Sequence, residues 1–187
     1  PVAVSFRKIG PNEIGFTAGP YRPEYPLTID PLLDWHTFMG SSNTDKGQAI
    51  AVDNNDHVYV TGFSDVTWGT PINAHSGGND IFVARLDTDG ALQWNTFLGS
   101  ALNDKGLAIA VDDSGNIYVA GYSEAEWGVD PVNDYAGGDD IVVAQLDDNT
   151  GALKWHTFLG AAAATDRANG IVVDDTNVYI TGYSADT

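Results

Sequence analysis

No cysteine occurs among the 187 residues, which excludes disulfide bonds, thiolate metal sites and cysteine nucleophiles. Basic residues are also scarce: eight Lys and Arg stand against 26 Asp and Glu, for a formal net charge of −18 at pH 7. Such a chain has no basic stripe to neutralise phosphates, so we expect it to bind neither nucleic acid nor anionic lipid. Its many carboxylates suit hard cations such as Ca²⁺ instead.

Long hydrophobic runs are missing as well. No apolar run approaches the roughly 20 residues that cross a bilayer, so we expect no membrane insertion. No signal peptide is visible, but the chain begins at Pro1 rather than Met, which is typical of a processed or partial product, so this does not decide the location. A hydrophobic content of 43%, with 11% aromatics, is enough to build a core.

One pattern of about thirty residues occurs three times. Its copies begin with "WHTFMG" at Trp35, "WNTFLG" at Trp94 and "WHTFLG" at Trp155, at spacings of 59 and 61 residues. A regular period of this size is typical of an array in which each unit leaves an apolar face for its neighbours to cover. We therefore expect a repeat protein in which adjacent units share a core.

The hydrophobic period inside a unit is two, as expected for strands. The alternation is clearest in "AIAVD" (49–53), "HVYVTGFS" (57–64) and "DIFVARLD" (80–87). Turn-forming residues separate the strands at "DNND" (53–56) and "DTDG" (87–90), and later at "DDSGN" (112–116) and "DDNTG" (147–151). One unit thus predicts four antiparallel strands with one long loop (65–79, 124–139), which is the pattern of a β-propeller blade.

These features resemble the SBBP (seven-bladed β-propeller) repeats of bacterial and archaeal surface and secreted proteins. The matching segments are "TFLG", "AIAVD", "NIYVAGYS", "GG-x-D" at 77–80 and 137–140, and "VARLD" or "VAQLD". The stretch "YRPEYPLTIDPLLDW" (21–35) is similar to the segment that precedes the first such repeat. The resemblance covers roughly 21–187 and implies an all-β array of propeller blades in an extracellular or cell-surface protein.

The expected architecture is an incomplete ring. The repeats, assigned to 31–187, hold about two and a half units, whereas a closed propeller has four to eight blades. We therefore expect a fragment of a longer chain, or an assembly in which several chains complete one another. Residues 1–30 differ, because their alternation around "GPN" (10–12) predicts a β-hairpin followed by a Pro-rich segment. We interpret them as the end of a preceding domain or as a strand donated to a neighbouring subunit.

Aspartates recur at fixed places in the units, which predicts a structural role. A carboxylate that closes a turn is needed in every unit, whereas a catalytic centre needs unlike groups that converge once. The alternative is Ca²⁺ coordination, since "DTDG" partly resembles the start of a calcium loop, although the later bidentate Glu is missing. The recurring positions are Asp45, Asp104 and Asp166; Asp53, Asp112 and Asp174; Asp80 and Asp140; and Asp87 and Asp147. The candidate metal ligands are Asp87, Asp89, Asp147 and Asp148, with Asp53 and Asp56 as a second set.

The tryptophans fall into two groups. Trp35, Trp94 and Trp155 open equivalent strands, and we expect them to pack between adjacent blades. Trp68 and Trp127 lie in the long loops, where an exposed indole would stack on a sugar or anchor a protein partner. These two are the candidate ligand-binding residues, and the alternative is burial beneath the loop.

The sequence shows no catalytic constellation. No His-x-x-x-His pair, Ser/His/Asp order or phosphate-cradling Gly loop is visible, and His36 and His156 simply occupy equivalent positions beside a Trp. We therefore expect a non-enzymatic extracellular or cell-surface module, structural or adhesive, that assembles into a filament or binds protein partners or surface glycans. The alternatives are a lectin-like propeller that binds carbohydrate or Ca²⁺, and part of a propeller enzyme whose site lies elsewhere.

Overall fold

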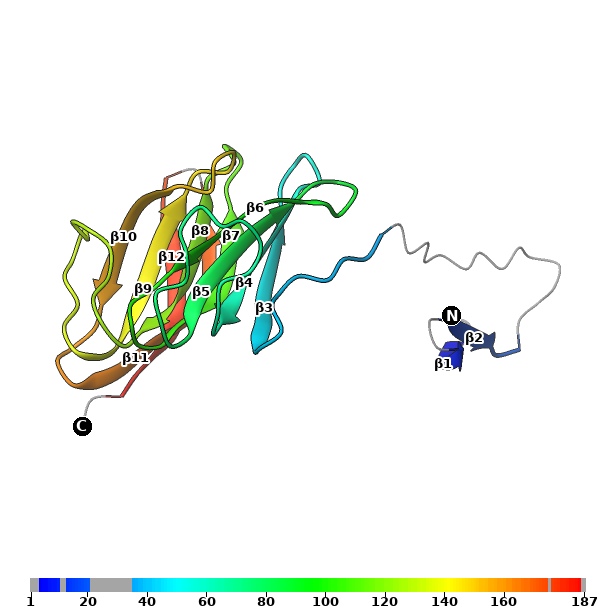
Figure 1. The fold of residues 1–187 in the computed structure, drawn as a ribbon, viewed down its shortest axis with the longest axis horizontal. Helices are drawn as coiled ribbons and strands as arrows, with labels where there is room; N and C mark the ends of the chain where they lie inside the picture. The colour runs from blue at the N-terminus through cyan, green and yellow to red at the C-terminus, as the bar shows by residue number, and fades with distance from the viewer. Residues whose placement is uncertain (1–3, 11–12, 21–34, 175, 186–187) are drawn as a thin grey trace. The chain divides into compact units, whose positions relative to one another are not determined.

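A computed structural model describes residues 4–10, 13–20, 35–174 and 176–185 (Figure 1). None of these residues belongs to a helix that could span a membrane. The chain divides into two units, Pro1–Asp34 and Trp35–Thr187. In the first, β1 (Val4–Gly10) and β2 (Glu13–Ala18) pair antiparallel, which confirms the predicted hairpin. The leader segment 21–34 lies outside the described residues.

The second unit is built from antiparallel meanders whose strands follow sequence order, and the start of the last hairpin also pairs in parallel with the third strand of the preceding meander. Each complete meander is one predicted unit of four strands, so the blade pattern is confirmed. Blade 1 comprises β3 (Asp45–Val52), β4 (Val58–Ser64), β5 (Asp80–Leu86) and β6 (Leu92–Leu98). Blade 2 comprises β7 (Asp104–Val111), β8 (Ile117–Ser123), β9 (Gly138–Leu146) and β10 (Leu153–Leu159). The hairpin of β11 (Ala164–Val173) and β12 (Val178–Ala185) is named blade 3.

The blades pack face to face (Figure 1). Ile81 and Val83 of β5 belong to the apolar cluster shared with blade 2, whereas Phe82 and Ala84 pack on the other face, against Trp68. Successive side chains of a strand point to opposite faces, so a strand that is covered on both sides is apolar throughout. A second shared cluster joins blades 2 and 3 and contains Ala108, Ala120, Val143, Ala168 and Ile171.

The first strand of every blade carries a β-bulge at the same place. The register shifts between Gly47 and Ala49 in β3, and at the equivalent positions in β7 and β11. The bulge brings the backbone of β3 against Gly62 in β4, where any Cβ would collide with the carbonyl oxygen of Lys46. This contact explains the glycine of "TGFS", which recurs as Gly121 and Gly182 and meets an equivalent carbonyl in each blade.

Candidate functional site

The blade junctions are the sites at which the repeated residues come together, and a tryptophan makes the first cross-blade contact. The indole N–H of Trp94 in β6 donates to the carbonyl oxygen of Asp148 in the β9–β10 turn of blade 2, at 2.8 Å. Arg85 donates to the same oxygen at 3.1 Å. A side chain at Gly151 would collide with the Trp94 ring, so glycine, with a φ of 65°, lets the turn lie on the indole.

The other tryptophans of this group make equivalent contacts. Trp35 lies against Gly90 in the β5–β6 turn of blade 1. Trp155 packs on the apolar cluster that blades 2 and 3 share. The predicted packing between blades is therefore confirmed for Trp94 and Trp155, whereas Trp35 contacts the turn of blade 1.

A cation stacked on an aromatic ring makes the second contact. Lys105, at the start of β7, lies with its Nζ 4.5 Å from the centre of the Phe63 ring in blade 1. At the next junction the guanidinium of Arg167 lies 3.9 Å from the centre of the Tyr122 ring and also pairs with Asp139. Such a contact contributes about 0.5–2 kcal/mol, depending on how far the cation is removed from water.

The third contact is a pair of buried carboxyl groups. Asp80 begins β5 of blade 1 and Asp104 begins β7 of blade 2, and both are buried. A Cβ placed on Gly99 would lie 2.8 Å from Asp80 Oδ1 and 2.8 Å from Asp104 Oδ2, so both oxygens border the same small space. Gly160 separates Asp140 and Asp166 in the same way at the next junction.

Burial changes the acidity of these pairs. It raises the pKa of Asp104 to about 6, against the hydrogen bonds from Ser100 and Ser123 and with help from the nearby Asp80 charge. Burial also raises the pKa of Asp80 and that of Asp140, and the Asp166 charge adds to the latter effect. A carboxyl group removed from water favours its neutral form, and a neighbouring carboxylate favours it further.

The aspartates that follow "AIAV" close turns, as predicted. Asp112 Oδ1 accepts hydrogen bonds from the backbone N–H groups of Ser114 and Asn116 at 2.9 and 2.8 Å. Its Oδ2 accepts the hydroxyl of Tyr118 at 3.1 Å. Asp53 and Asp174 repeat this arrangement in blades 1 and 3.

The four candidate calcium ligands lie in two different turns. Asp87 Oδ1 accepts the backbone N–H groups of Asp89 and Ala91 in the β5–β6 turn. Asp147, in the β9–β10 turn, accepts the N–H of Thr150 and lies 3.3 Å from Lys154. Among the described residues, no three acidic or imidazole side chains converge into a group that could hold a metal. Calcium binding at Asp87, Asp89, Asp147 and Asp148 stays a prediction.

The loop tryptophans Trp68 and Trp127 are buried, each with 7% of its surface exposed. Trp127 stacks on His156, with 4.5 Å between ring centres, and His156 Nε2 lies 2.8 Å from the carbonyl oxygen of Trp127. Asn95, the residue equivalent to His156, donates to the carbonyl oxygen of Trp68 at 2.9 Å. These contacts anchor each long loop to the last strand of its blade, and sugar stacking on either indole stays a prediction.

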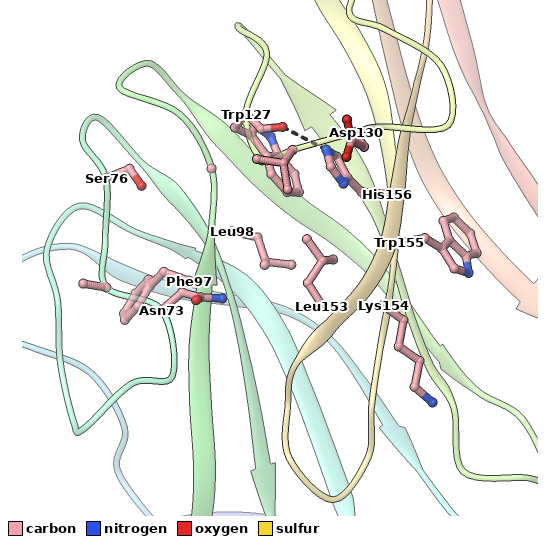
Figure 2. A pocket seen from close by; sticks show the side chains of 14 residues that line it. Asn73, Ser76, Phe97, Leu98, Trp127, Asp130, Leu153, Lys154, Trp155 and His156 are labelled. Atoms are coloured by element: carbon pink, nitrogen blue, oxygen red, sulfur yellow. Dashed lines mark hydrogen bonds between the residues drawn. The ribbon is translucent and has the colours of Figure 1, made fainter.

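A cleft of about 470 Å³ lies between the long loop of blade 1 and the β10 strand of blade 2 (Figure 2). Its walls mix apolar and charged side chains, among them Phe97, Leu153, Trp155, Asp130 and Lys154. Figure 2 shows Trp127 beside His156, and it shows the Trp155 ring on the other side of β10. The cleft is thus the place where a predicted ligand-binding residue borders open space.

Sequence reasoning noticed the recurrence of Asp80, Asp104, Asp140 and Asp166 but missed their pairing. The two members of a pair belong to different blades. The repeat shows the position of each carboxylate within its own unit but not which carboxylate of the next unit it meets. The glycine that ends "TFLG" was the available signal, because Gly99 and Gly160 leave the space that the two carboxyl groups share.

Face-to-face blades of four antiparallel strands, joined by repeated contacts, define the class of this chain as a β-propeller-type repeat protein. A comparison with protein families shows which repeat it is: the family described as SBBP, beta-propeller repeat, matches residues 93–125 and 154–186. The chain therefore carries SBBP repeats, as the resemblance indicated. Each match runs from the last strand of one blade through the first two strands of the next, so it spans a junction.

A distant relative is also a repeat protein. An uncharacterized WD repeat-containing protein of Acanthamoeba polyphaga mimivirus is 26% identical to this chain over 115 residues. The similar stretch covers 51% of this chain and 8% of the length of the viral protein. The two comparisons together support a propeller-type repeat module.

Proposed function

We propose that this chain is a non-enzymatic structural and adhesive module of an extracellular or cell-surface protein, and that its two outer blade faces dock onto further blades of the same type, which a second copy supplies in a solution of this chain. The location rests on the resemblance to surface and secreted SBBP proteins. The docking rests on one observation. The two outer faces of the blade array present the same residues that meet each other at the internal junctions.

Equivalent residues are covered inside the array and exposed on its outer faces. Ile109 and Ile171, which face the preceding blade, are 8% and 9% exposed, whereas Ile50 in the same position of blade 1 is 67% exposed. Tyr122, which faces the following blade, is 4% exposed, whereas Tyr183 of blade 3 is 45% exposed. The Ile50 face and the Tyr183 face are therefore the complementary surfaces that meet at each internal junction.

The geometry predicts head-to-tail association. Val52 extends the exposed apolar surface on blade 1, and Val172 and Tyr179 extend it on blade 3. A contact between two different faces of identical chains generates a ring if the rotation closes and a filament if it does not. Lys46 of one copy would then lie over Tyr183 of the next, as Lys105 lies over Phe63.

The mass of the native particle as a function of protein concentration tests this proposal. We expect the wild-type mass to rise with concentration, and we expect Ile50→Glu and Tyr183→Glu each to remain monomeric, because each buries a charge in the contact. Each variant keeps one intact face, so their mixture should form dimers and nothing larger. Val129→Glu, at an exposed loop position, is the control and should behave as wild type. A wild-type chain that stays monomeric at every concentration would reject docking of a second copy.

Glycan binding at the cleft between blades 1 and 2 is a second candidate, because Trp127 and Trp155 both line that cleft. A glycan array tests it. Binding that is lost in Trp155→Ala and retained in Trp35→Ala, whose indole lies at the β5–β6 turn, would support this function. An array on which the wild-type chain binds no glycan would reject it.

A further inference from the structure

One oxygen of each junction carboxyl pair lacks a hydrogen-bond partner within the described part of the chain. The oxygens are Asp80 Oδ1 and Asp140 Oδ1, and both belong to fully buried side chains. A buried polar atom without a partner destabilises a fold by about 1–3 kcal/mol, and by more if the group is charged. Because the same oxygen is unpaired at equivalent positions of two blades, the deficit is a property of the repeat.

Donors are distributed unequally between the two carboxyl groups of a pair. Asp104 Oδ2 accepts the backbone N–H of Ser100 at 2.7 Å and its hydroxyl at 2.9 Å, and Asp104 Oδ1 accepts the hydroxyl of Ser123. Asp80 Oδ2 accepts the backbone N–H of Ser76 at 2.6 Å. Asp80 Oδ1 is therefore the oxygen of this pair that lacks a donor, and it borders the same space as Asp104 Oδ2.

The second pair has an unpaired oxygen at the equivalent position, Asp140 Oδ1. Asp140 Oδ2 accepts the backbone N–H of Ala136 at 2.5 Å, and Asp166 Oδ2 accepts that of Ala161 at 3.0 Å. Asp140 Oδ1 and Asp166 Oδ2 both border Gly160. At each pair, therefore, the unpaired oxygen of one carboxyl group and an oxygen of the other border the same space beside a glycine.

We propose that each blade junction binds one proton between its two carboxyl groups. The proton, taken from solvent, resides on Oδ1 of Asp80 or Asp140 and is donated in a hydrogen bond to Oδ2 of Asp104 or Asp166. It turns the unpaired acceptor into a donor and removes one of two like charges from a buried site, as in other closely spaced carboxyl pairs. The chain would then carry two proton-binding sites, one per junction.

The titratable groups around the pairs make other contacts and do not donate a hydrogen bond to the unpaired oxygens. His75 Nε2 lies 3.9 Å from Asp80 Oδ1 and bonds to the carbonyl oxygen of Gly78 at 3.1 Å. At the second pair Tyr135 takes the place of His75 and donates to the equivalent carbonyl of Gly138 at 2.6 Å. The remaining charged groups near the pairs are Glu124, Lys105, Asp139 and Arg167; Lys105 lies over Phe63, and Arg167 pairs with Asp139.

The consequence is a pH-dependent junction. The raised pKa values of Asp80, Asp104 and Asp140 mean that the folded state binds these protons more tightly than the unfolded chain does. The stabilisation is complete below the unfolded pKa of about 4 and is lost as the pH rises through about 6. At the Asp80–Asp104 junction, where the pKa of Asp104 rises to about 6, this changes the unfolding equilibrium constant by up to about 100-fold.

Asp80→Asn tests the proposal, because an amide nitrogen at the Oδ1 position imitates the protonated oxygen. The equilibrium constant of unfolding is measured by urea denaturation, with far-ultraviolet circular dichroism, between about pH 4 and pH 8. We expect the wild-type constant to rise across this range, and we expect Asp80→Asn to lower it at pH 8 and to flatten the rise. Asp140→Asn should act likewise at the second junction. All variants are measured with Ile50→Glu as the common background, so that self-docking does not contribute to the result.

Three control variants distinguish the loss of proton binding from the loss of a charge or of a hydrogen bond. Asp134→Asn removes one exposed charge and should leave the pH dependence unchanged. His75→Tyr introduces the residue of blade 2 and removes an imidazole that lowers the pKa of Asp80, so it should move the rise to higher pH without flattening it. Asp104→Asn removes the same charge as Asp80→Asn but loses an acceptor for serine donors, so it should destabilise the fold. A pH dependence of Asp80→Asn equal to that of Asp134→Asn would overturn the proposal.

A titration of the wild-type chain checks the same inference without any mutation. Carbon-13 resonances of the aspartate carboxyl groups should show one group per junction that stays protonated at pH 5. Resonances of Asp80, Asp104, Asp140 and Asp166 that all report ionised groups at pH 5 would also overturn it.

Discussion

Trp94 of blade 1 donates its indole N–H to the backbone carbonyl oxygen of Asp148 in blade 2, at 2.8 Å. A side chain from the last strand of one blade thus closes a turn of the next. This contact, the stacked cation and the carboxyl pair all lie at the junction. The sequence repeat therefore encodes the junction between two blades. The stability of such an array is governed by interfaces between neighbours as much as by the blades themselves.

Removal of the Trp94 contact tests this view. We expect Trp94→Phe to lower the free energy of unfolding by about 1–3 kcal/mol, because an aromatic ring is kept but one hydrogen bond and part of the indole packing are lost. Trp94→Ala should lower it by about 3–5 kcal/mol, because it also leaves a cavity. Urea denaturation followed by circular dichroism measures both. Trp155→Phe, at a half-buried position, is the matched variant, and an equal loss there would contradict a specific role for Trp94.

Two glycines that face each other across the β3 bulge should differ sharply. Gly62→Ala places a methyl group on the carbonyl of Lys46, so we expect a loss of about 1–3 kcal/mol or more. The Cβ of Gly47→Ala would lie an ordinary 3.7 Å from Val60 Cγ1, and this variant should be neutral or stabilised by up to about 1 kcal/mol. The thermal midpoints of the two variants distinguish these outcomes, and similar midpoints would show that the bulge does not require glycine.

The turn aspartates should control stability at the acid end of the pH range. Burial raises the pKa of Asp112, but hydrogen bonds from Asn116 and Tyr118 outweigh it, so the net shift is downward. The N–H groups of Thr176 and Asn177 lower the pKa of Asp174 to about 2. A lowered pKa means that this stabilisation is present above about pH 4 and is lost as the pH falls towards 2.

Asp112→Asn provides the measurement for this acid limb. Asparagine keeps the turn but cannot titrate, so the urea midpoint of this variant should fall less than that of wild type between about pH 4 and pH 2. Asp113→Asn, at the exposed next position, should follow the wild-type curve. Because the junction carboxyl groups titrate in the opposite sense between about pH 4 and 6, the wild-type chain should be most stable near pH 4 to 5.

The strands and turns of this chain could be predicted because their signals are local. "DDSGN" closes with a hydrogen bond from Gly115 to Asp112, and "DDNTG" with one from Gly151 to Asp147, as their Asp and Gly residues indicate. The alternation in "DIFVARLD" likewise identified β5. The roles of the long-loop residues were harder to predict, since an indole beside a glycine has the same sequence signature whether it is exposed or buried.

The sequence by itself determined the blade, because a period of two and turn-forming residues act within a few positions of one another. It also determined the repeat, and hence that each unit must cover its neighbour. Only the tertiary structure decided which residues meet at a junction. Asp80 and Asp104 become neighbours when two sheets pack face to face, and the angle and separation of that packing depend on the whole apolar interface rather than on any local pattern.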